Sequence, residues 1–543
     1  MHLTFFEELV VQIEKTWANV TSKDISRLLF LFTLILCMIL GLDNGMLFSS
    51  DAYAYFYMTE LISEKQQLFS TDPIPFFLEL NGLYYSPYPL GYSLLGVPFY
   101  LAFEFSSGSP ILGLRFTNMI IFSFSVYFTN EFANDLKNKA LGLLSSLVFI
   151  FGTFAIEHVL HIWSHIPSMF FVLLAIRYLI LYERQGNEKY LYISSLSSGA
   201  AFWIRYFNII LAILILLYLI IKYSRQIGVY LSFTGIFLSI ISPTLLYHQI
   251  SFGNAFITPY AYHALPYDIR FLRYTIWYML IEYHPYPKAF TPAAYFHSSL
   301  LESSPILILS LYGFYLLYRQ NKEFVLIVGA HFWIIVLIYG IFEAWDGGWC
   351  LSMRHLTDTL PFLSIATGRY IQHQMRKLQN YKLIAISMIM GVFLITFLFW
   401  ILMATKFYQT IVITKRVAVN QISRFIGLSI ASFMSVLLFV HIKKKERIEQ
   451  ILIISLLALV LLAVAWAFFL NVGLNTVMWT SGGNRVLPTV DWIVALLKLP
   501  GYDDSYTHPV THYPLYLSLF LTTLAFFVLN IIYLTRIKPL IKQ

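Results

Sequence analysis

Charged residues are scarce in this sequence. Asp, Glu, Lys and Arg together make up 12% of its 543 residues, while apolar residues make up 58%. A soluble globular protein carries about 25% charged residues. The shortage of charge therefore excludes a soluble globular protein of this length and indicates a chain that crosses a membrane several times.

Cysteine is also scarce, which removes two further classes of protein. The two cysteines are Cys37, inside an apolar run, and Cys350, in a predicted loop. They cannot form a disulfide framework or a structural zinc site, because both need more thiols. The chemistry of the protein must come from other side chains.

Long apolar runs, in contrast, are abundant and predict the fold. A helix needs about 20 apolar residues to cross the hydrocarbon core of a membrane. Such runs begin near residues 26, 110, 140, 166, 190, 207, 227, 304, 324, 355, 383, 424, 450 and 513. We therefore predict an all-α polytopic membrane protein with about fourteen transmembrane helices.

Two segments are predicted to lie at the membrane surface. Residues 87–105 are apolar but contain three prolines and two glycines. Because proline and glycine interrupt helices, we predict an interfacial or re-entrant segment there. Residues 1–25 are predicted to be a cytoplasmic amphipathic segment, because Phe6, Val10, Ile13 and Trp17 recur at helical spacing.

The distribution of positive charge predicts the topology. The net charge of +8 would by itself suit an anionic partner such as nucleic acid. Most Lys and Arg residues, however, fall in the short segments that alternate helices place in the cytoplasm. We therefore predict a cell-membrane protein with both termini cytoplasmic and no nucleic-acid partner.

This topology leaves three long segments on the outer face, at about 47–109, 247–303 and 471–512. Loops of this length in a compact protein are usually functional. We expect the first and the fourth outer loops to contain interfacial helices. Any active site is accordingly predicted on the outer face of the membrane.

The first candidate for chemistry is Asp51, which directly follows the first predicted span. A carboxylate at the lip of a cavity can accept a proton from an acceptor hydroxyl. An acid at this position also fits a solvated helix end, because such a placement costs little. The residue type alone leaves both interpretations open.

The second candidate is a group of four residues in the short outer loop that precedes the predicted span at 166. Spacings of three and four put His158, His161 and His165 on one helical face, and Glu157 lies four residues before His161. Imidazole and carboxylate groups could bind a substrate or a divalent metal ion. Histidines that are simply hydrogen-bonded at an interface give the same pattern.

The third candidate lies just ahead of the predicted span at 355, where Arg354 and His355 follow Trp345 and Trp349. The planar guanidinium of Arg354 could hold phosphate oxygens. The tryptophans could form an interfacial belt beside a lipid with an anionic head. An arginine that snorkels to the interface is the alternative.

The outer loop that follows the predicted span at 227 adds arginines among aromatic residues. Such a mixture suits sugar rings and phosphates, although any membrane-surface helix has a similar composition. The candidates in this loop are Arg270 and Arg273. Arg115 and Arg205, near outer ends of other spans, are further candidates for the same site.

Four segments in a fixed order now identify a family resemblance. They are Asp51 after the first span, YSPYPLGYSLLGVPFY from Tyr85 to Tyr100, SFGNAFITPY at 251–260 and GGWCLSMRHLTDTLPFL at 347–363. Together they resemble integral-membrane glycosyltransferases of the GT-C class, in the branch of the protein O-mannosyltransferases and the lipid A aminoarabinose transferase. The resemblance covers residues 26 to 370.

The resemblance implies an inverting transfer of a hexose or pentose from a polyprenyl-phosphate carrier to a lipid, glycan or protein acceptor on the outer face. It implies that Asp51 acts near the acceptor and that Glu157 assists. The donor phosphate and lipid would then contact Arg354, Arg270, Arg273, His355 and Tyr85. No cofactor is implied with certainty, and a divalent metal ion stays one interpretation of the histidines.

We accordingly predict three parts of the chain: 1–25, a catalytic transmembrane module at 26–372, and C-terminal transmembrane helices at 373–543 that include outer loop 471–512. The alternative function is a polytopic transporter or a flippase for lipid-linked glycans. Transporters place ionisable groups near the bilayer midplane. His331 is the one clear case in the predicted spans, which favours an enzyme with its site on one side.

Overall fold

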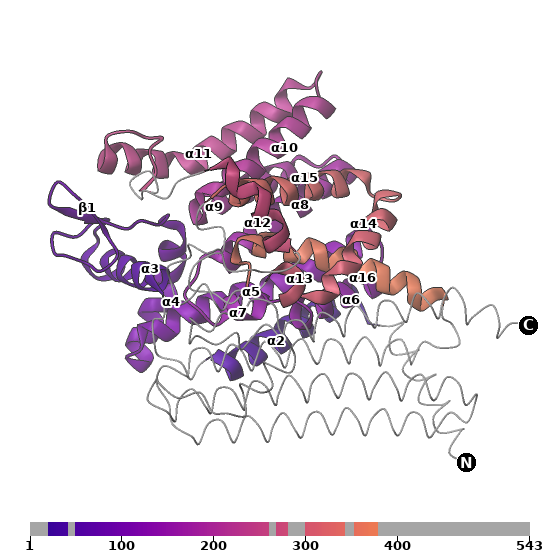
Figure 1. Cartoon of the computed structure of the whole chain (residues 1–543), viewed down its shortest axis with the longest axis horizontal. Coiled ribbons are helices and arrows are strands. Elements are labelled where there is room, and N and C mark those ends of the chain that lie inside the picture. The colour runs from indigo at the N-terminus through magenta and orange to yellow at the C-terminus, as the bar shows by residue number, and fades with distance from the viewer. Residues whose placement is uncertain (1–19, 42–48, 260–267, 281–298, 343–351, 378–543) are drawn as a thin grey trace, which may run out of the picture. The chain divides into compact units, whose positions relative to one another are not determined.

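The computed structural model describes residues 20–41, 49–259, 268–280, 299–342 and 352–377. These residues are almost entirely helical, with one two-stranded hairpin, which confirms the predicted all-α class for the part described (Figure 1). The predicted spans near 383, 424, 450 and 513, the loop 471–512, and Trp345 and Trp349 lie outside the described residues, as does nearly all of the segment 1–25.

The chain divides into two compact units. The described part of the first comprises 20–41, 49–259, 268–276, 307–342 and 353–377, and the described part of the second comprises 277–280, 299–306 and 352. All the candidate site residues that are described belong to the first unit. The predicted division of the chain at residues 25 and 372 stays a prediction.

The N-terminal third of the described chain contains a long helix, an irregular segment and a hairpin. Its elements are α2 (Ser22–Gly41), α3 (Ser50–Glu60), the π-helical turn η1 (Leu61–Lys65), β1 (Leu78–Leu80), β2 (Leu83–Tyr85) and α4 (Gly91–Ser107). The strands are antiparallel, with Leu78 opposite Tyr85 and Leu80 opposite Leu83. The first outer loop of the prediction therefore contains helices, as expected.

The central helices pack closely against one another. They are α5 (Pro110–Leu136), α6 (Lys139–Phe151), the short α7 (Ala155–Val159), α8 (His165–Gln185) and α9 (Glu188–Ile204). Helix α8 packs against both α5 and α9. Asn138 starts α6 because its side chain accepts a hydrogen bond from the backbone N–H of Leu141 at 3.1 Å.

The remaining helices begin after a short 3₁₀ turn, η2 (Tyr206–Asn208). They are α10 (Ile209–Lys222), α11 (Ile227–Phe252), η4 (Ile269–Phe271), α12 (Leu272–Leu280), α13 (Leu300–Ser303), η6 (Pro305–Leu309), α14 (Ser310–Tyr318), α15 (Lys322–Gly340), the 3₁₀ segment η7 (Arg354–Thr359) and α16 (Leu360–Lys377). Each of the ten predicted helix starts that fall in described residues lies within four residues of the start of an α-helix or a 3₁₀ segment.

Among the described residues, four helices are long and apolar enough to cross a membrane: α5, α8, α11 and α15. Shorter apolar helical stretches cover 139–151, 206–222 and 306–318. The predicted total of about fourteen spans therefore stays a prediction.

Segment 87–105 differs from the prediction in one respect. Helix α4 continues from Gly91 to Ser107 through Pro98, without the break that its prolines and glycines suggested. The glycines serve packing instead. A Cβ atom on Gly91 would lie 2.5 Å from the backbone oxygen of Trp203, so only glycine lets the start of α4 approach the end of α9.

Two apolar clusters hold the first unit together. The larger one surrounds α8 and includes Phe132, Leu173, Ile176, Leu211, Phe324 and Phe362. The smaller one joins α3, α4, α5 and the end of α9 through Ala52, Tyr55, Tyr92, Leu114, Ile162 and Ile204. The smaller cluster fixes the start of α3 against the end of α9, and this placement positions the site.

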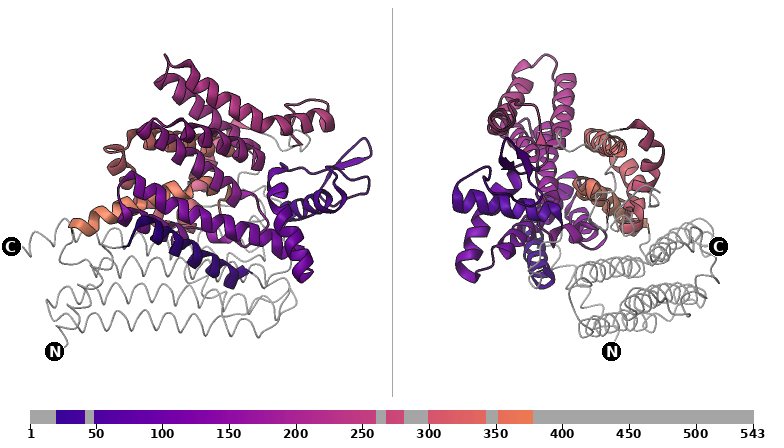
Figure 2. Two further views of the ribbon diagram at one scale, coloured as in Figure 1. Left: turned by 180° about the vertical axis from the view of Figure 1, so that it is seen from behind. Right: turned by 60° about the vertical axis from the view of Figure 1, so that its left-hand side comes forward.

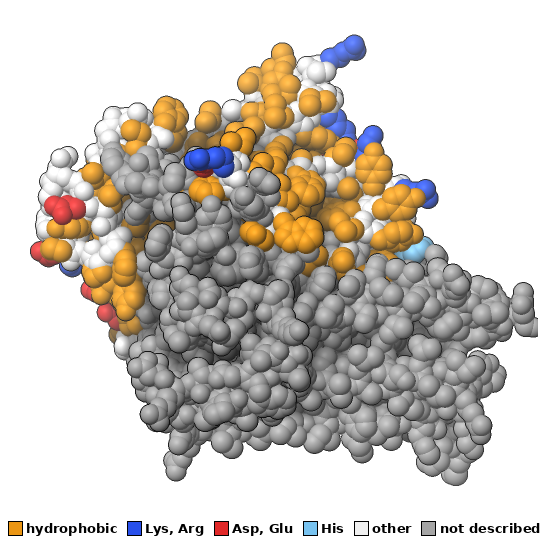
Figure 3. Space-filling model, viewed as in Figure 1, with side chains coloured by type: hydrophobic (Ala, Val, Ile, Leu, Met, Phe, Trp, Pro, Cys, Tyr) orange, Lys and Arg blue, Asp and Glu red, His pale blue; other side chains and the backbone are white. Residues whose placement is uncertain are grey.

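The outer surface of the described helices is largely apolar. Helix α11 lies at the edge of the first unit in two views (Figures 1 and 2), and 22% of its most apolar stretch is buried, against 78% for α8. Hydrophobic side chains predominate among the described side chains that are visible in Figure 3. Exposed hydrophobic residues of the described helices include Leu217, Ile221, Leu238, Leu311 and Trp333. An apolar surface of this extent suits contact with lipid.

Candidate active site

Asp51 lies in the first turn of α3 and has a donor on each carboxylate oxygen. The helix begins there because Ser49 accepts a hydrogen bond from the backbone N–H of Ala52. The Tyr88 hydroxyl donates to Oδ1 of Asp51 at 2.5 Å, and the Arg354 guanidinium donates to Oδ2 at 2.6 Å. The structure thus brings together the predicted acid and the predicted phosphate-binding arginine.

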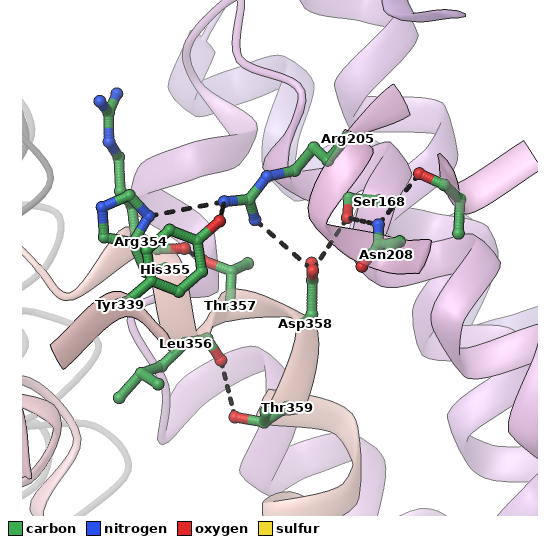
Figure 4. A network of polar contacts seen from close by, with 11 residues as sticks. Ser168, Arg205, Asn208, Tyr339, Arg354, His355, Leu356, Thr357, Asp358 and Thr359 are labelled. Carbon is green, nitrogen blue, oxygen red and sulfur yellow. Dashed lines mark hydrogen bonds and ion pairs between the residues drawn. The ribbon is translucent and has the colours of Figure 1, made fainter. Parts of the chain in front are cut away.

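The ion pair between Asp51 and Arg354 is mostly removed from water, with side chains 14% and 15% exposed. The two charges of such a pair attract each other more strongly than those of an exposed pair. Removing either partner also destabilises the protein more, because it leaves the other charge buried and unpaired. Arg354 is the first residue of η7, and its side chain extends away from the cluster around Arg205 (Figure 4).

The histidine segment is tied to the start of α3. The side chain of Asn118 donates to the carbonyl oxygens of His161 and Trp163 at 2.6 and 3.0 Å. The indole N–H of Trp163 donates to Ser49 Oγ at 2.8 Å. The buried loop between α7 and α8 is therefore hydrogen-bonded to Ser49, two residues before Asp51.

The rings of this segment pack against one another rather than converging on a point. The Trp163 ring lies 5.3 Å from His158 and 4.6 Å from His161, and His158 lies 5.4 Å from His165, all between centroids. No group of three or more His, Cys, Asp or Glu side chains in the described residues could hold a metal ion. The geometry therefore does not support the interpretation of these histidines as a metal site.

Burial and neighbouring arginines keep two of these histidines neutral. The pKa of His158 is lowered well below its usual value, first by burial and then by the charges of Arg354 and Arg205. The pKa of His161 is lowered well below its usual value by burial, then by Arg115 and His158. At pH 7 both imidazoles are therefore uncharged hydrogen-bonding groups.

A second polar network surrounds Arg205, the residue at the end of α9 (Figure 4). Its guanidinium donates to the Tyr339 hydroxyl at 2.6 Å and lies 3.5 Å from Oδ2 of Asp358. It also lies 3.5 Å from Nδ1 of His355. The imidazole of His355 stacks on the Tyr339 ring at 3.9 Å and 13°.

Asp358 anchors this network from inside the protein. Its Oδ2 accepts a hydrogen bond from Ser168 at 2.9 Å, and Asn208 in turn donates to Ser168 at 2.8 Å. The network therefore joins α8, the end of α9, the end of α15 and η7.

The other predicted residues have different surroundings. Glu157 is fully buried in α7, directly before His158. Tyr85 is buried in β2 against the rings of Phe69 and Phe252. Arg270 is 88% exposed and pairs with Asp268, so it does not enter the buried network.

Arg273 lies in α12, but its side chain is outside the described residues.

Several contributing residues did not stand out in the sequence. Tyr88 lies in the string 85–100, where nothing distinguishes it from the other tyrosines. Tyr339 ends an apolar helix, and Ser168 and Asn208 lie beside helix starts. Tyr339, Ser168 and Asn208 share one signal, a polar residue at the end of an apolar run. That signal is too common in the sequence to identify them as site residues.

The site residues come from helix ends that share one side of the predicted topology. They stand at the starts of α3, α8 and η7 and at the ends of α9 and α15. Alternation of the predicted spans puts each of these ends on the outer side. The contacts among them agree with that alternation, since helix ends on opposite sides of a membrane could not meet.

Part of the chain matches a known protein family. Residues 96–247 match the model of the family described as dolichyl-phosphate-mannose-protein mannosyltransferase. The match includes Glu157, His158 and Arg205 but neither Asp51 nor Arg354. It confirms the predicted resemblance to integral-membrane GT-C glycosyltransferases of the O-mannosyltransferase branch and supports a membrane glycosyltransferase.

Solved structures with a similar chain path include ArnT from Cupriavidus metallidurans bound to undecaprenyl phosphate. The identity is 11% and the TM-score 0.48, over 92% of this chain and 76% of that chain. The oligosaccharyltransferase AglB from Archaeoglobus fulgidus, in complex with an inhibitory peptide and a dolichol-phosphate, matches at 12% identity and a TM-score of 0.46, over 70% of this chain and 56% of that chain. No curated protein matches the chain.

Proposed function

We propose that this protein transfers a sugar from a polyprenyl-phosphate carrier to an acceptor hydroxyl at the outer face of the membrane. The observation that carries the proposal is the contact between Asp51 and Arg354, which lie 303 residues apart in the sequence. A base and a phosphate-binding cation are the two groups that such a transfer needs. The family match favours this reaction because its members are described as using dolichyl-phosphate-mannose.

On the donor side, Arg354 binds the phosphate. Its planar guanidinium can give two parallel hydrogen bonds to phosphate oxygens. As the bond between the anomeric carbon and the phosphate oxygen breaks, its electron pair moves to that oxygen, and Arg354 stabilises the growing negative charge. His355 contributes a neutral donor beside it.

On the acceptor side, Asp51 acts as the general base. The acceptor oxygen attacks the anomeric carbon opposite the leaving phosphate, which inverts that carbon, and its proton moves to Asp51. Both oxygens of Asp51 have a donor, Tyr88 and Arg354. The donor phosphate competes for Arg354, and we expect this competition to release Oδ2 for the acceptor.

Two further residues support this arrangement. Glu157 assists at the acceptor side from its buried position beside His158. The buried, neutral histidines add no positive charge next to Arg354. The exposed Arg270 has no role in this proposal. The experiment that tests the proposal includes lipid, glycan and protein acceptors.

The first prediction tests the proposal directly. Purified protein in lipid nanodiscs is given a panel of polyprenyl-phosphate hexoses and pentoses, and release of polyprenyl phosphate and formation of glycoside are followed. We expect Asp51→Asn to lower kcat by about 10² to 10⁴ and Arg354→Ala to lower kcat/KM by about 10² to 10³. Arg177→Gln, which removes the ion pair with Asp135, is the control and should keep its activity.

Two outcomes would contradict the proposal. Undiminished turnover in Asp51→Asn would remove Asp51 as the base. Accumulation of the lipid-linked sugar across sealed vesicles, with no glycoside formed, would identify a transporter or flippase instead.

A further inference from the structure

We propose that Arg205 is a positioning residue that fixes the tautomer and the orientation of His355, so that His355 presents its Nε2–H to the donor phosphate. The part that concerns the phosphate rests on the proposed function. The part that concerns Arg205 and His355 does not, because it follows from the contacts of these two side chains.

The tautomer follows from the chemistry of the contact. A guanidinium group only donates hydrogen bonds. The Arg205 guanidinium lies 3.5 Å from Nδ1 of His355, and this contact is a hydrogen bond only if Nδ1 accepts, so we assign Nδ1 as the unprotonated nitrogen. The proton of the neutral imidazole is then on Nε2, which points away from Arg205 (Figure 4).

The orientation is set by two contacts at right angles to each other. The Tyr339 ring covers one face of His355 at 3.9 Å, while Arg205 holds its edge. Tyr339 is itself held, because its hydroxyl accepts a hydrogen bond from Arg205 at 2.6 Å. One guanidinium therefore fixes both the imidazole and the ring on which it stacks.

Arg205 is in turn held by buried groups. Its side chain is 10% exposed and pairs with Asp358, whose side chain is 3% exposed. Ser168 and Asn208 extend the chain of hydrogen bonds into α8 and η2. Reorienting Arg205 would leave Asp358 as a buried charge without its cation, which is strongly unfavourable.

This assignment separates the roles of two arginines. Arg354 extends toward Asp51 and is the cation that meets the phosphate in the proposed reaction. Arg205 is neutralised by Asp358 and acts through His355. The sequence suggested Arg205 as a further candidate for the site that binds sugar rings and phosphates, whereas its contacts favour an indirect role there.

The tautomer is measurable without any enzymatic assay. Protein labelled with ¹⁵N-histidine is reconstituted in lipid, and the His355 signals are assigned by their loss in His355→Gln. We expect the wild-type Nδ1 resonance of an unprotonated nitrogen and the Nε2 resonance of a protonated one. A protonated Nδ1 in the wild-type protein would overturn the proposal.

Variants of Arg205 test its part in fixing the tautomer. In Arg205→Met, which has no donor, we expect a second set of His355 signals with a protonated Nδ1. In Arg205→Lys, which keeps a donor, we expect the wild-type tautomer to predominate. Identical His355 spectra in the wild type and Arg205→Met would overturn the proposal, and Arg177→Gln controls for loss of another arginine that pairs with an Asp.

Geranyl phosphate, a short polyprenyl phosphate, tests the link to the donor. We expect it to shift the Nε2 resonance of His355 in the wild type, and its dissociation constant to rise about tenfold in Arg205→Met, as for loss of one hydrogen bond to a charged group. Donor KM should rise by a similar factor, with a smaller change in kcat.

The tautomer measurement and the activity assay distinguish failure of the Arg205 proposal from failure of the proposed function. A correct tautomer without sugar transfer would leave the assignment of Arg205 standing and reject the proposed function. Sugar transfer with unchanged geranyl phosphate affinity in Arg205→Met would reject the link between Arg205 and the donor.

Discussion

At the scale of single residues, the site is defined by pairings that no local pattern contains. Asp51 receives one hydrogen bond from Tyr88, 37 positions away, and another from Arg354, 303 positions away. Both Asp51 and Arg354 could be selected from the sequence, because a charge at the end of an apolar run is conspicuous. Tyr88 and Tyr339 could not, since their role depends on which helix ends meet.

Tyr88 carries a prediction at this scale. In Tyr88→Phe, Asp51 loses the hydroxyl that orients Oδ1, so we expect kcat to fall about tenfold, the usual scale for one hydrogen bond to a charged group. Donor KM should change little, because Tyr88 does not contact Arg354 in the proposed reaction. Steady-state kinetics of sugar transfer provide the measurement.

Tyr53→Phe is the control for Tyr88→Phe. It removes a hydroxyl from the same helix as Asp51, and its ring stacks on Tyr57. Equal kinetic losses in the two variants would mean that Tyr88 has no specific part in orienting Asp51.

At the scale of elements, the boundaries of helices were the most predictable feature. Helices α5 and α11 begin at the residues where their apolar runs begin, 110 and 227. The segment with Pro98 was less predictable, because a helix can continue through proline when its neighbours satisfy the freed backbone groups. Which glycines break a helix and which allow close packing depends on the neighbouring helix.

Gly91 provides the prediction at the scale of elements. In Gly91→Ala the new Cβ would meet the carbonyl of Trp203 at 2.5 Å, and a backbone atom cannot move aside as a side chain can. We expect a loss of about 1–3 kcal/mol in stability, together with lower activity, because the start of α4 and the end of α9 carry Tyr88 and Arg205 toward the site.

Gly235→Ala in α11 is the matched control, since nothing lies within 4 Å of its Cβ position. Thermal unfolding in detergent, followed by intrinsic fluorescence, compares the two variants. Equal unfolding temperatures for Gly91→Ala and the wild type would show that α4 and α9 do not need this close approach.

At the scale of the whole molecule, the sequence predicted the all-α class and the helix positions of the described part, and it singled out Asp51 and Arg354, which the structure brings into contact. It did not predict that the histidine segment is a packed layer of rings, because H-x2-H-x3-H spacing does not reveal that the Trp163 ring contacts both His158 and His161. Nor did it reveal that Arg270 faces outward, since an arginine among aromatic residues suits a surface and a site equally.

The buried histidines predict how stability depends on pH. The folded pKa values of His158 and His161 lie below the usual 6.5, so the unfolded chain binds more protons between those values and 6.5. Stability should therefore fall as the pH is lowered from 7 to 5.

The double variant His158→Gln, His161→Gln isolates the contribution of the histidines. Its unfolding temperature should decrease less than that of the wild type between pH 7 and pH 5. Parallel curves for the two proteins would mean that these histidines are protonated as easily in the folded state as in the unfolded one.

The long separation of Asp51 from Arg354 also has a consequence for biosynthesis. A ribosome needs about 15–60 s to add the 303 residues between them, at about 5–20 residues per second. During that interval Asp51 and then Tyr88 have been synthesised, but Arg354 has not. The contact between Asp51 and Arg354, on which the proposed catalysis depends, can therefore form only late, after the chain has been synthesised as far as Arg354.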